Sequence, residues 1–561
     1  MLTRAERYIQ LLNVTLPIIS RLTFPRDESG PDPNSSMTTP DSLLSKTRFY
    51  LRKVLNGLVI VLVLSAITLP YFFYVKKTNA GLSFATPLQV PELLEFKLVD
   101  GDKVFELIPQ IGETAFIEAQ TTATLGYNGN YLGPTIRVKQ GDNFVVHVTN
   151  TLNVDTTVHW HGMHVPPEMD GTPHQSIAPG ETWTARYPIL NQASTMWYHP
   201  HPHGKTSEQV FRGLVGLFLI EDENSQSLGL PQVYGYDDIP LVIQDRLFNR
   251  GGDLHYELNK GAYYGDTILV NGTHDPFVEV PAKQVRLRLL NGSNARTYHF
   301  GFDDDRMFHQ IATDGGLLEG PVELNRIRLS PGERIEIVVD FSAGEPALLK
   351  SFPDDDILTL VESVIADGIG NGHFDILKIV PGEILTTPVN PLPTVLNRID
   401  RWQPADADKT RRMVLGGQVT EGPRAPGPGP RIPINGKLMD MARVDEIVCL
   451  NDIEIWEITN RGGQPHPFHI HDVQFLILDR DGVPAAATEA GWKDTVLVRA
   501  NETLRFITQF TTYSSSHVPF MYHCHILEHE DGGMMGQFLV VDMECKVDPH
   551  RPLPAIHLPS H

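Results

Sequence analysis

Segments in which apolar and polar residues alternate recur three times along the chain. They occupy residues 136–150, 280–291 and 448–460, and turn-forming Gly, Pro and Asn stand at or near their ends. Each is followed by a turn and a second alternating segment, at 178–187, 330–339 and 500–508. Alternation of this kind is typical of strands that are half buried in a β-sandwich. We therefore predict an all-β fold with three related β-sandwich domains.

The length of the chain agrees with this division. A chain of 561 residues is too long for one hydrophobic core and fits about three domains. We place the domains at 85–228, 235–380 and 434–547, after an N-terminal arm at 1–53 that is cytoplasmic or disordered. The stretch 381–433 is rich in Pro and Gly, including Ala425-Pro-Gly-Pro-Gly-Pro430, and is interpreted as a linker.

One hydrophobic segment does not fit the sandwich pattern. Val54 to Val75 is an uncharged, mostly apolar run of 22 residues. As a helix it would be about 33 Å long, enough to cross a hydrocarbon core of about 30 Å. Lys and Arg gather before it, which predicts that the N-terminus stays in the cytoplasm. We interpret it as a single-pass transmembrane anchor in a bacterial inner membrane, with the downstream domains in the periplasm. The alternative is a cleaved signal peptide and an exported soluble protein.

Charge and cysteine content narrow the functional classes. The formal net charge is −22, which argues against nucleic-acid binding. The chain has three cysteines. Cys449 and Cys545 fall near predicted strands of the third domain. We interpret them as two buried free thiols, with a disulfide between them as the alternative.

Histidines two residues apart form the main chemical pattern. In an extended strand, residues i and i+2 point to the same face, so each such pair can aim two imidazoles into one cleft. A single pair would more often be an ordinary surface or core feature. Four pairs, one of them flanking a cysteine, indicate a shared metal cluster. These pairs are His159 with His161, His199 with His201, His469 with His471, and His523 with His525.

A second metal site is indicated around the cysteine. A blue copper site takes a thiolate, two imidazoles and a weak thioether. Cys524, His529 and Met534 supply three of these within a short stretch, and His466 stands apart from the pairs upstream.

At these residues the chain resembles the multicopper oxidases, the family of laccases, bilirubin oxidases and bacterial copper-tolerance oxidases. The resemblance implies three cupredoxin-like Greek-key domains and four copper ions. It assigns type 1 copper to His466, Cys524, His529 and Met534, and type 2 copper to His159 and His469. It assigns His161, His199 and His525 to one type 3 ion, and His201, His471 and His523 to the other. The middle domain has no ligand motif and is interpreted as a spacer.

The resemblance also implies an activity. Four one-electron oxidations of a reductant would be coupled to reduction of dioxygen to water. Such chemistry needs protons, and carboxylates near the cluster are natural carriers. Asp170 and Glu530 match acidic positions that the bacterial branch of the family uses as proton relays; otherwise each would be a solvated loop carboxylate. His164, His174 and His203 are interpreted as groups that support the ligands or lie at the surface.

The reductant is less well defined. The bacterial cuprous oxidases have a methionine-rich insertion in the region of the linker, but here the only methionine at 381–433 is Met413. The approach at 461–465 also lacks the Asp and Met residues with which those oxidases bind Cu(I). We therefore expect phenols, aromatic amines or similar molecules to reach His466 or His529 of a monomeric enzyme. The alternatives are a cuprous or other metal-ion oxidase for copper tolerance, and a copper-binding or division-associated scaffold without catalysis.

Overall fold

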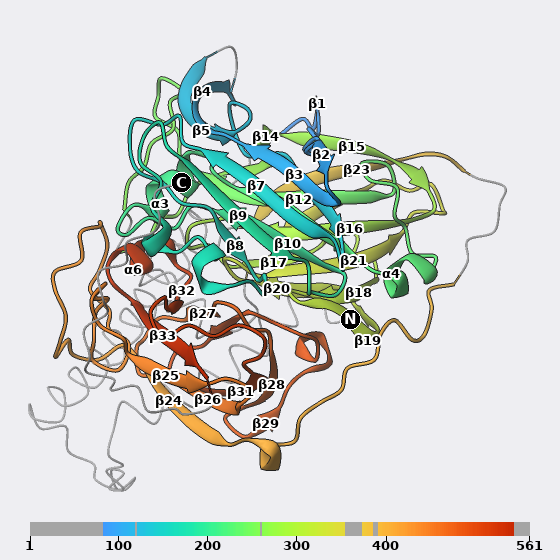
Figure 1. Ribbon diagram of the computed structural model, residues 1–561. Coiled ribbons are helices and arrows are strands. Elements are labelled where there is room, and N and C mark those ends of the chain that lie inside the picture. The colour runs from blue at the N-terminus through green and yellow to red at the C-terminus, as the bar shows by residue number, and fades with distance from the viewer. Residues whose placement is uncertain (1–81, 118–119, 259–260, 354–372, 385–390, 543–561) are drawn as a thin grey trace, which may run out of the picture. The chain divides into compact units, whose positions relative to one another are not determined.

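The structure is a computed structural model that describes residues 82–117, 120–258, 261–353, 373–384 and 391–542 (Figure 1). Within these residues strands dominate, and the helices are few and short. They are α3 (Thr206–Arg212), α4 (Glu223–Ser227), α6 (Leu527–Asp531) and the 3₁₀ turns η1 (Pro167–Met169), η2 (Pro173–Gln175), η3 (Pro404–Asp406) and η4 (Ala487–Glu489). The predicted all-β class is confirmed.

The first sandwich encloses a buried apolar core between two four-stranded sheets. One sheet contains β2 (Phe96–Val99), β3 (Asp102–Leu107), β7 (Asn143–Thr149) and β9 (Thr182–Pro188). The other contains β6 (Ile136–Lys139), β11 (Gly216–Glu221), β10 (Ser194–His199) and β8 (His159–His161). A separate two-stranded sheet is formed by β4 (Pro109–Ala115) and β5 (Thr121–Tyr127).

The middle sandwich has the largest sheets, of six and seven strands. The first contains β1 (Thr86–Pro87), β15 (Pro276–Ala282), β23 (Phe374–Ile384), β22 (Ala347–Ser351), β17 (Tyr298–Phe302) and β20 (Arg326–Leu329). The second contains β14 (Thr273–His274), β13 (Thr267–Val270), β12 (Asp238–Arg246), β16 (Gln284–Asn291), β21 (Arg334–Asp340), β18 (Phe308–Thr313) and β19 (Gly316–Leu324).

The third sandwich is built from two five-stranded sheets. One contains β24 (Lys409–Leu415), β26 (Ile453–Asn460), β31 (Thr503–Gln509), β28 (Phe475–Arg480) and β29 (Val483–Pro484). The other contains β25 (Glu446–Cys449), β33 (Met535–Val541), β32 (Phe520–Cys524), β27 (His466–Ile470) and β30 (Thr495–Val498). Strand β24 lies inside the stretch that the composition predicted to be a linker.

The repeated segments pair in the same way in each sandwich. Strand β7 runs antiparallel to β9, β16 to β21, and β26 to β31. In β26 every second side chain from Glu454 to Asn460 is buried, so one face of the strand lies on the core. The alternation seen in the sequence thus has the cause expected of a strand in a sandwich.

Two interpretations concern cysteines and the N-terminal region. Cys449 is disulfide-bonded, so the prediction of a free thiol was wrong there, whereas Cys524 is free and buried. Cys545 lies outside the described residues, as do the N-terminal arm and the predicted anchor at 54–75. Among the described residues, no helix is both long and apolar enough to cross a membrane.

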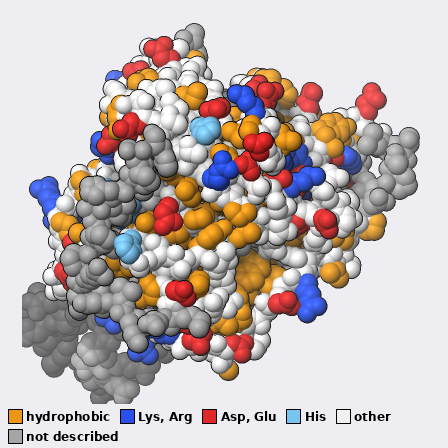
Figure 2. Space-filling view, in the orientation of Figure 1, with side chains coloured by type: hydrophobic (Ala, Val, Ile, Leu, Met, Phe, Trp, Pro, Cys, Tyr) orange, Lys and Arg blue, Asp and Glu red, His pale blue; other side chains and the backbone are white. Residues whose placement is uncertain are grey.

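Acidic side chains are spread over the molecular face drawn in Figure 2, where basic and hydrophobic side chains lie between them. On that face, the acidic side chains are therefore not gathered into one patch.

Candidate copper centres

The four histidine pairs lie on or beside two pairs of neighbouring strands. In the first sandwich, β8 and β10 are antiparallel and His159 stands opposite His199. In the third sandwich, β27 and β32 are antiparallel and His469 stands opposite His523. All eight imidazoles are buried. Short paired strands thus bring residues that are far apart in sequence to one place.

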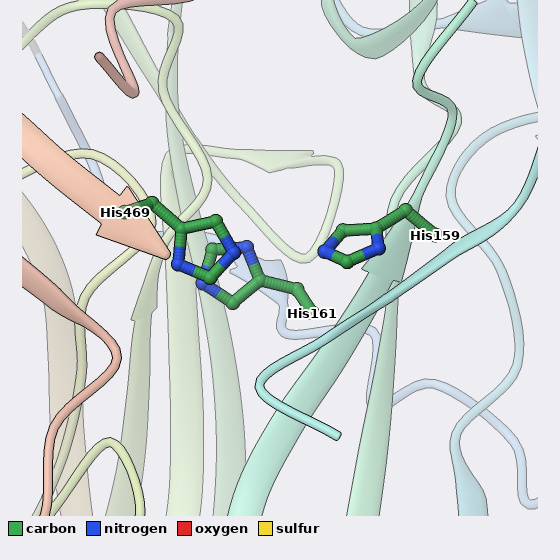
Figure 3. A group of neighbouring side chains, drawn as sticks. All are labelled: His159, His161 and His469. Carbon is green, nitrogen blue, oxygen red and sulfur yellow. The ribbon is translucent and has the colours of Figure 1, made fainter. Parts of the chain in front are cut away.

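These eight histidines converge into three groups, two of which share His161. Within each group the nitrogens that could bind a metal lie within 4.8 Å of one another. Figure 3 shows one group, in which His469 of the third sandwich lies against His161 of the first, and His159 faces them. The groups are His159, His161 and His469; His161, His199 and His525; and His201, His471 and His523.

Hydrogen bonds leave one ring nitrogen free in three of these histidines. Nδ1 of His159, His199 and His469 donates to a backbone carbonyl at 2.8–2.9 Å. Nε2 of the same three rings is buried and has no hydrogen-bond partner among the described residues. A ring that donates from one nitrogen presents the lone pair of the other, which is the state a metal ligand needs.

The group around His523 brings the ring nitrogens of three histidines close together. Its Nε2 lies 3.3 Å from Nε2 of both His201 and His471. Burial is the main cause that lowers the pKa of His201 and His471 well below the usual range, and neighbouring histidines lower it further. Neutral nitrogens that face one another suit a metal cation between them. The residues present therefore fit a copper cluster.

A separate group surrounds Cys524. Its Sγ lies 3.5 Å from Nδ1 of His466 and 3.6 Å from Nδ1 of His529, and those two nitrogens are 3.3 Å apart. Burial lowers the pKa of His466 to about 4 and raises the pKa of the Cys524 thiol. A buried thiolate needs a cation beside it, and this donor set suits copper. Met534 is also buried, and its carbonyl accepts from the Cys524 amide at 3.1 Å.

Two buried carboxylates contact the cluster. Asp170 Oδ2 accepts from Nδ1 of His471 at 2.8 Å, and its Oδ1 lies 3.2 Å from Nδ1 of His159. Glu530 lies 3.2 Å from Nδ1 of His523 and 3.4 Å from Nδ1 of His201. Burial, and then Asp531, raises the pKa of Glu530 well above its usual range. Neither Asp170 nor Glu530 is a solvated loop carboxylate.

Comparison with known proteins agrees with this geometry. Family models described as multicopper oxidase match residues 110–225, 233–347 and 406–544. Multicopper oxidase mco of Staphylococcus aureus is 36% identical over 447 residues, which are 79% of this chain and 89% of that protein. The chain belongs to the multicopper oxidase family. Cell division protein FtsP of Escherichia coli (strain K12) is 37% identical to this multicopper oxidase, over 81% of this chain and 92% of that protein.

Solved structures agree on the architecture of this multicopper oxidase. A laccase from Pediococcus acidilactici Pa5930 is 36% identical with a TM-score of 0.72, and the match covers 81% of this chain and 94% of that one. The laccase-like multicopper oxidase CueO from Ochrobactrum sp. is 37% identical with a TM-score of 0.73, over 81% of this chain and 100% of the other. The predicted cupredoxin-like, multidomain fold is confirmed.

Asp494 of this multicopper oxidase also contacts the histidine cluster, and the sequence pattern did not predict it. Asp494 directly precedes β30 and is fully buried. Its Oδ1 accepts from Nε2 of His161 at 3.0 Å, and its backbone carbonyl accepts from Nδ1 of His469 at 2.8 Å. Asp494 therefore contacts one histidine of the first sandwich and one of the third, as Asp170 does. No local motif marks it, since His161 is 333 residues away in sequence.

The three other histidines singled out from sequence lie apart from these metal-binding groups. His164 Nδ1 lies 2.8 Å from Oδ1 of Asp472, which is next to His471 in sequence. His174 Nε2 lies 2.8 Å from Oε1 of Gln537. His203 is partly exposed. Among the described residues, none of the three belongs to a group with metal-ligand spacing.

Proposed function

We propose that this protein is a copper-dependent oxidase that couples one-electron oxidation of phenols, aromatic amines or similar molecules to reduction of dioxygen to water. The observation that carries the proposal is the run His523-Cys524-His525. Cys524 belongs to the group with His466 and His529, whereas His523 and His525 belong to two different histidine groups. Three adjacent residues therefore join a thiolate site to a buried histidine cluster through the backbone.

In this proposal the type 1 ligands are His466, Cys524, His529 and Met534, and the remaining eight histidines hold a type 2 ion and a type 3 pair. Copper in these sites would supply one-electron transfer and the reduction of dioxygen. The chain itself orients the imidazoles through carbonyl and carboxylate acceptors, and it excludes bulk water because all eight rings are buried.

Protons are assigned to Asp170 and Glu530. Each carboxylate has oxygens within 3.4 Å of the Nδ1 atoms of two cluster histidines. In the part of the chain that the structure describes, neither forms an ion pair with a lysine or arginine. A carboxylate without a fixed cation can gain and release a proton, as a carrier must.

Two glycines beside the buried ring of His466 support an organic reductant. A Cβ atom added at Gly462 would lie 3.6 Å from Nε2 of His466, and one added at Gly463 would meet no atom within 4 Å. Nearby, a cavity of about 360 Å³ is lined by residues that include Gly416, Asn435 and Arg461. That volume suits a small organic molecule. The similar CueO from Ochrobactrum sp. is described as having oxidase activity towards lignin model compounds.

The comparisons favour two other candidates enough to test them. A multicopper oxidase from Campylobacter jejuni, 28% identical with a TM-score of 0.70, is described as a metallo-oxidase, which supports a metal ion such as Cu(I) as reductant. The resemblance to cell division protein FtsP supports a role in cell division, as a division-associated scaffold would have. For each of these functions we propose a monomer that is anchored in the inner membrane and faces the periplasm. For the two oxidase functions, the partners are dioxygen and the reductant.

Oxygen uptake by copper-loaded protein separates these functions. A phenol and Cu(I) are offered in separate assays, and Cys524→Ser, which keeps all eight cluster histidines, is the matched control. We expect uptake with the phenol that is lost in Cys524→Ser. Uptake with Cu(I) alone would establish the metal-ion oxidase. No uptake with either reductant from fully loaded protein would refute the oxidase and favour the scaffold.

A further inference from the structure

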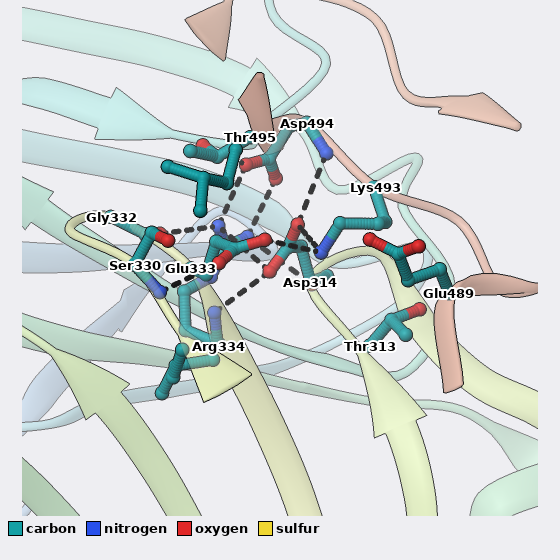
Figure 4. Close-up of polar contacts among 12 residues, drawn as sticks. Thr313, Asp314, Ser330, Gly332, Glu333, Arg334, Glu489, Lys493, Asp494 and Thr495 are labelled. Atoms are coloured by element: carbon teal, nitrogen blue, oxygen red, sulfur yellow. Dashed lines mark hydrogen bonds and ion pairs between the residues drawn. The ribbon is translucent and has the colours of Figure 1, made fainter. Parts of the chain in front are cut away.

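Arg334 reaches the histidine cluster from the sandwich that supplies no predicted copper ligand. It begins β21 of the middle sandwich, and its side chain is fully buried. Nη1 donates to Oδ1 of Asp494 at 2.7 Å, and Nη2 donates to Oδ2 at 2.6 Å (Figure 4). Paired bonds between a guanidinium and a carboxylate fix both position and orientation.

Asp494 transmits this position to two histidines. Its Oδ1 accepts from Nε2 of His161, which leaves Nδ1 of that ring without a partner among the described residues. Its carbonyl accepts from Nδ1 of His469, whose Nε2 is likewise free within the described ranges. The two rings stack, with centroids 3.7 Å apart and planes 12° apart. Asp494 therefore sets which nitrogen of each ring faces the cluster.

The hydroxyl of Thr495 completes this arrangement. It lies 2.9 Å from Oδ1 of Asp494, 3.0 Å from Nε2 of His161 and 3.2 Å from Nδ1 of His469. Both histidines are thus held by the same two consecutive residues, Asp494 and Thr495. Of these two side chains, that of Asp494 is bound by the guanidinium of Arg334.

Arg334 is itself held by all three sandwiches. Its Nε donates to the carbonyl of Thr195 on β10 at 2.9 Å, and Nη1 donates to the carbonyl of Gly332 in its own sandwich at 3.0 Å. Its amide donates to Asp314, whose carboxylate pairs with Lys493 of the third sandwich at 2.9 Å. These bonds leave the guanidinium little freedom to move.

A second contact from the turn before β21 supports this arrangement. Gly332 has φ of +83°, and a Cβ atom added there would lie 2.9 Å from the ring of His525. The backbone of the middle sandwich therefore packs directly against one cluster histidine, while Arg334 holds two others through Asp494.

We propose that Arg334 is a positioning residue that, through Asp494, holds His161 and His469 in the geometry for binding the type 2 ion and one type 3 ion. The inference rests on the copper ligation proposed above. It replaces the interpretation of the middle domain as a spacer. It also gives the two similar carboxylates different tasks: Asp494 is fixed by an arginine and orients ligands, whereas Asp170 has no such clamp among the described residues.

The test compares Arg334→Lys with Arg288→Lys in copper-loaded, full-length protein. Arg288 is a matched control because it is a buried arginine of the same sandwich, pairs with Asp238 and Glu336, and also contacts Thr195. Within the described part of the chain, its side-chain hydrogen bonds involve no histidine. A lysine keeps the charge but cannot form the paired bonds at either position.

We expect Arg334→Lys to lose or shift the electron paramagnetic resonance signal of type 2 copper. It should also hold cluster copper about 10- to 100-fold less tightly against a chelator, the usual effect of losing a residue that orients a metal ligand. The blue absorption of the type 1 site, which shares no ligand with the cluster, should remain. Arg288→Lys should keep both signals, even if it lowers thermal stability as much.

Equal spectra and copper retention in the two variants would overturn the proposal. If Arg334→Lys does not fold, Asp494→Asn replaces it, because the amide keeps an acceptor for His161 but breaks the paired bonds. Wild-type protein that binds no copper would refute the ligation itself. Normal copper signals in the wild type and in every variant would refute only the role of Arg334.

Discussion

Glu530 combines burial with contacts to two histidines of the cluster. It is 1% exposed, and both of its carboxylate oxygens lack a conventional hydrogen bond among the described residues. Burial and the nearby Asp531 raise its pKa, so its proton is present to a higher pH than on an exposed glutamate and is lost as pH rises. A buried acid of this kind is suited to donate protons to dioxygen reduction.

Replacing Glu530 by Gln should therefore slow oxygen reduction without removing copper. Gln has a similar size but cannot exchange a proton, so we expect oxygen uptake to fall by about 100-fold. We expect the wild-type rate to decline as pH rises and Glu530 loses its proton, and we expect a smaller decline in Glu530→Gln. Oxygen uptake measured across the pH range with excess reductant tests this, and the blue absorption checks that the type 1 site is intact. A variant with the wild-type rate and pH profile would contradict the assignment.

Residues whose positions follow a local rule could be predicted from the sequence. Histidines two apart, such as His159 and His161, were found because a strand puts them on one face. Glu530 and Asp170 were found because they stand near ligand motifs that resemble those of a known family. Asp494 and Arg334 were missed, because Asp494 lies 333 residues from His161 and 160 residues from Arg334, and no local spacing reports such contacts.

At the scale of elements, the connection between β26 and β27 passes beside Nε2 of His466. The segment 461–465 is short, and its two glycines differ in their surroundings. A side chain at Gly462 would point at Nε2 of His466 and Asn460, whereas one at Gly463 would enter open space. This connection was singled out in the sequence because it lacks Asp and Met residues, whereas the strand β24 inside the Pro/Gly-rich stretch 381–433 was not predicted. Strand β24 pairs with β26 in a parallel manner, a distant pairing that composition does not reveal.

We predict that Gly462→Leu reduces oxidation of phenols and Gly463→Leu does not. Neither glycine has a positive φ, so both positions accept a side chain without backbone strain. Leucine at 462 would cover the Nε2 edge of His466 and move the reductant away, for which we expect kcat/KM to fall about 10-fold or more. Steady-state rates with a bulky phenol measure this. An equal effect of both substitutions would show that the reductant does not approach His466 by this route.

At the scale of the whole molecule, the three sandwiches share more than the proposed copper cluster. One cluster of buried apolar side chains contains Trp197 of the first sandwich, Leu290 of the middle one and Leu527 of the third. Glu528 of α6 also accepts hydrogen bonds at 2.8 Å from Tyr256 and Asn294 of the middle portion. These contacts do not depend on a metal, so the sandwiches are held together before copper binds.

Copper in the cluster should nevertheless stabilise the protein, because its proposed ligands come from two sandwiches. A metal that binds only the folded chain adds about 2.7 kcal/mol when its concentration is 100 times its dissociation constant. Removal of all copper should therefore lower the midpoint of thermal unfolding measured by calorimetry. Cys524→Ser should keep most of this stabilisation, since the type 1 ligands all lie in the third sandwich and the cluster ligands remain. If Cys524→Ser lost as much stability as the copper-free protein, the stabilisation would come from the type 1 site, and copper in the cluster would not strengthen the contacts between the first and third sandwiches.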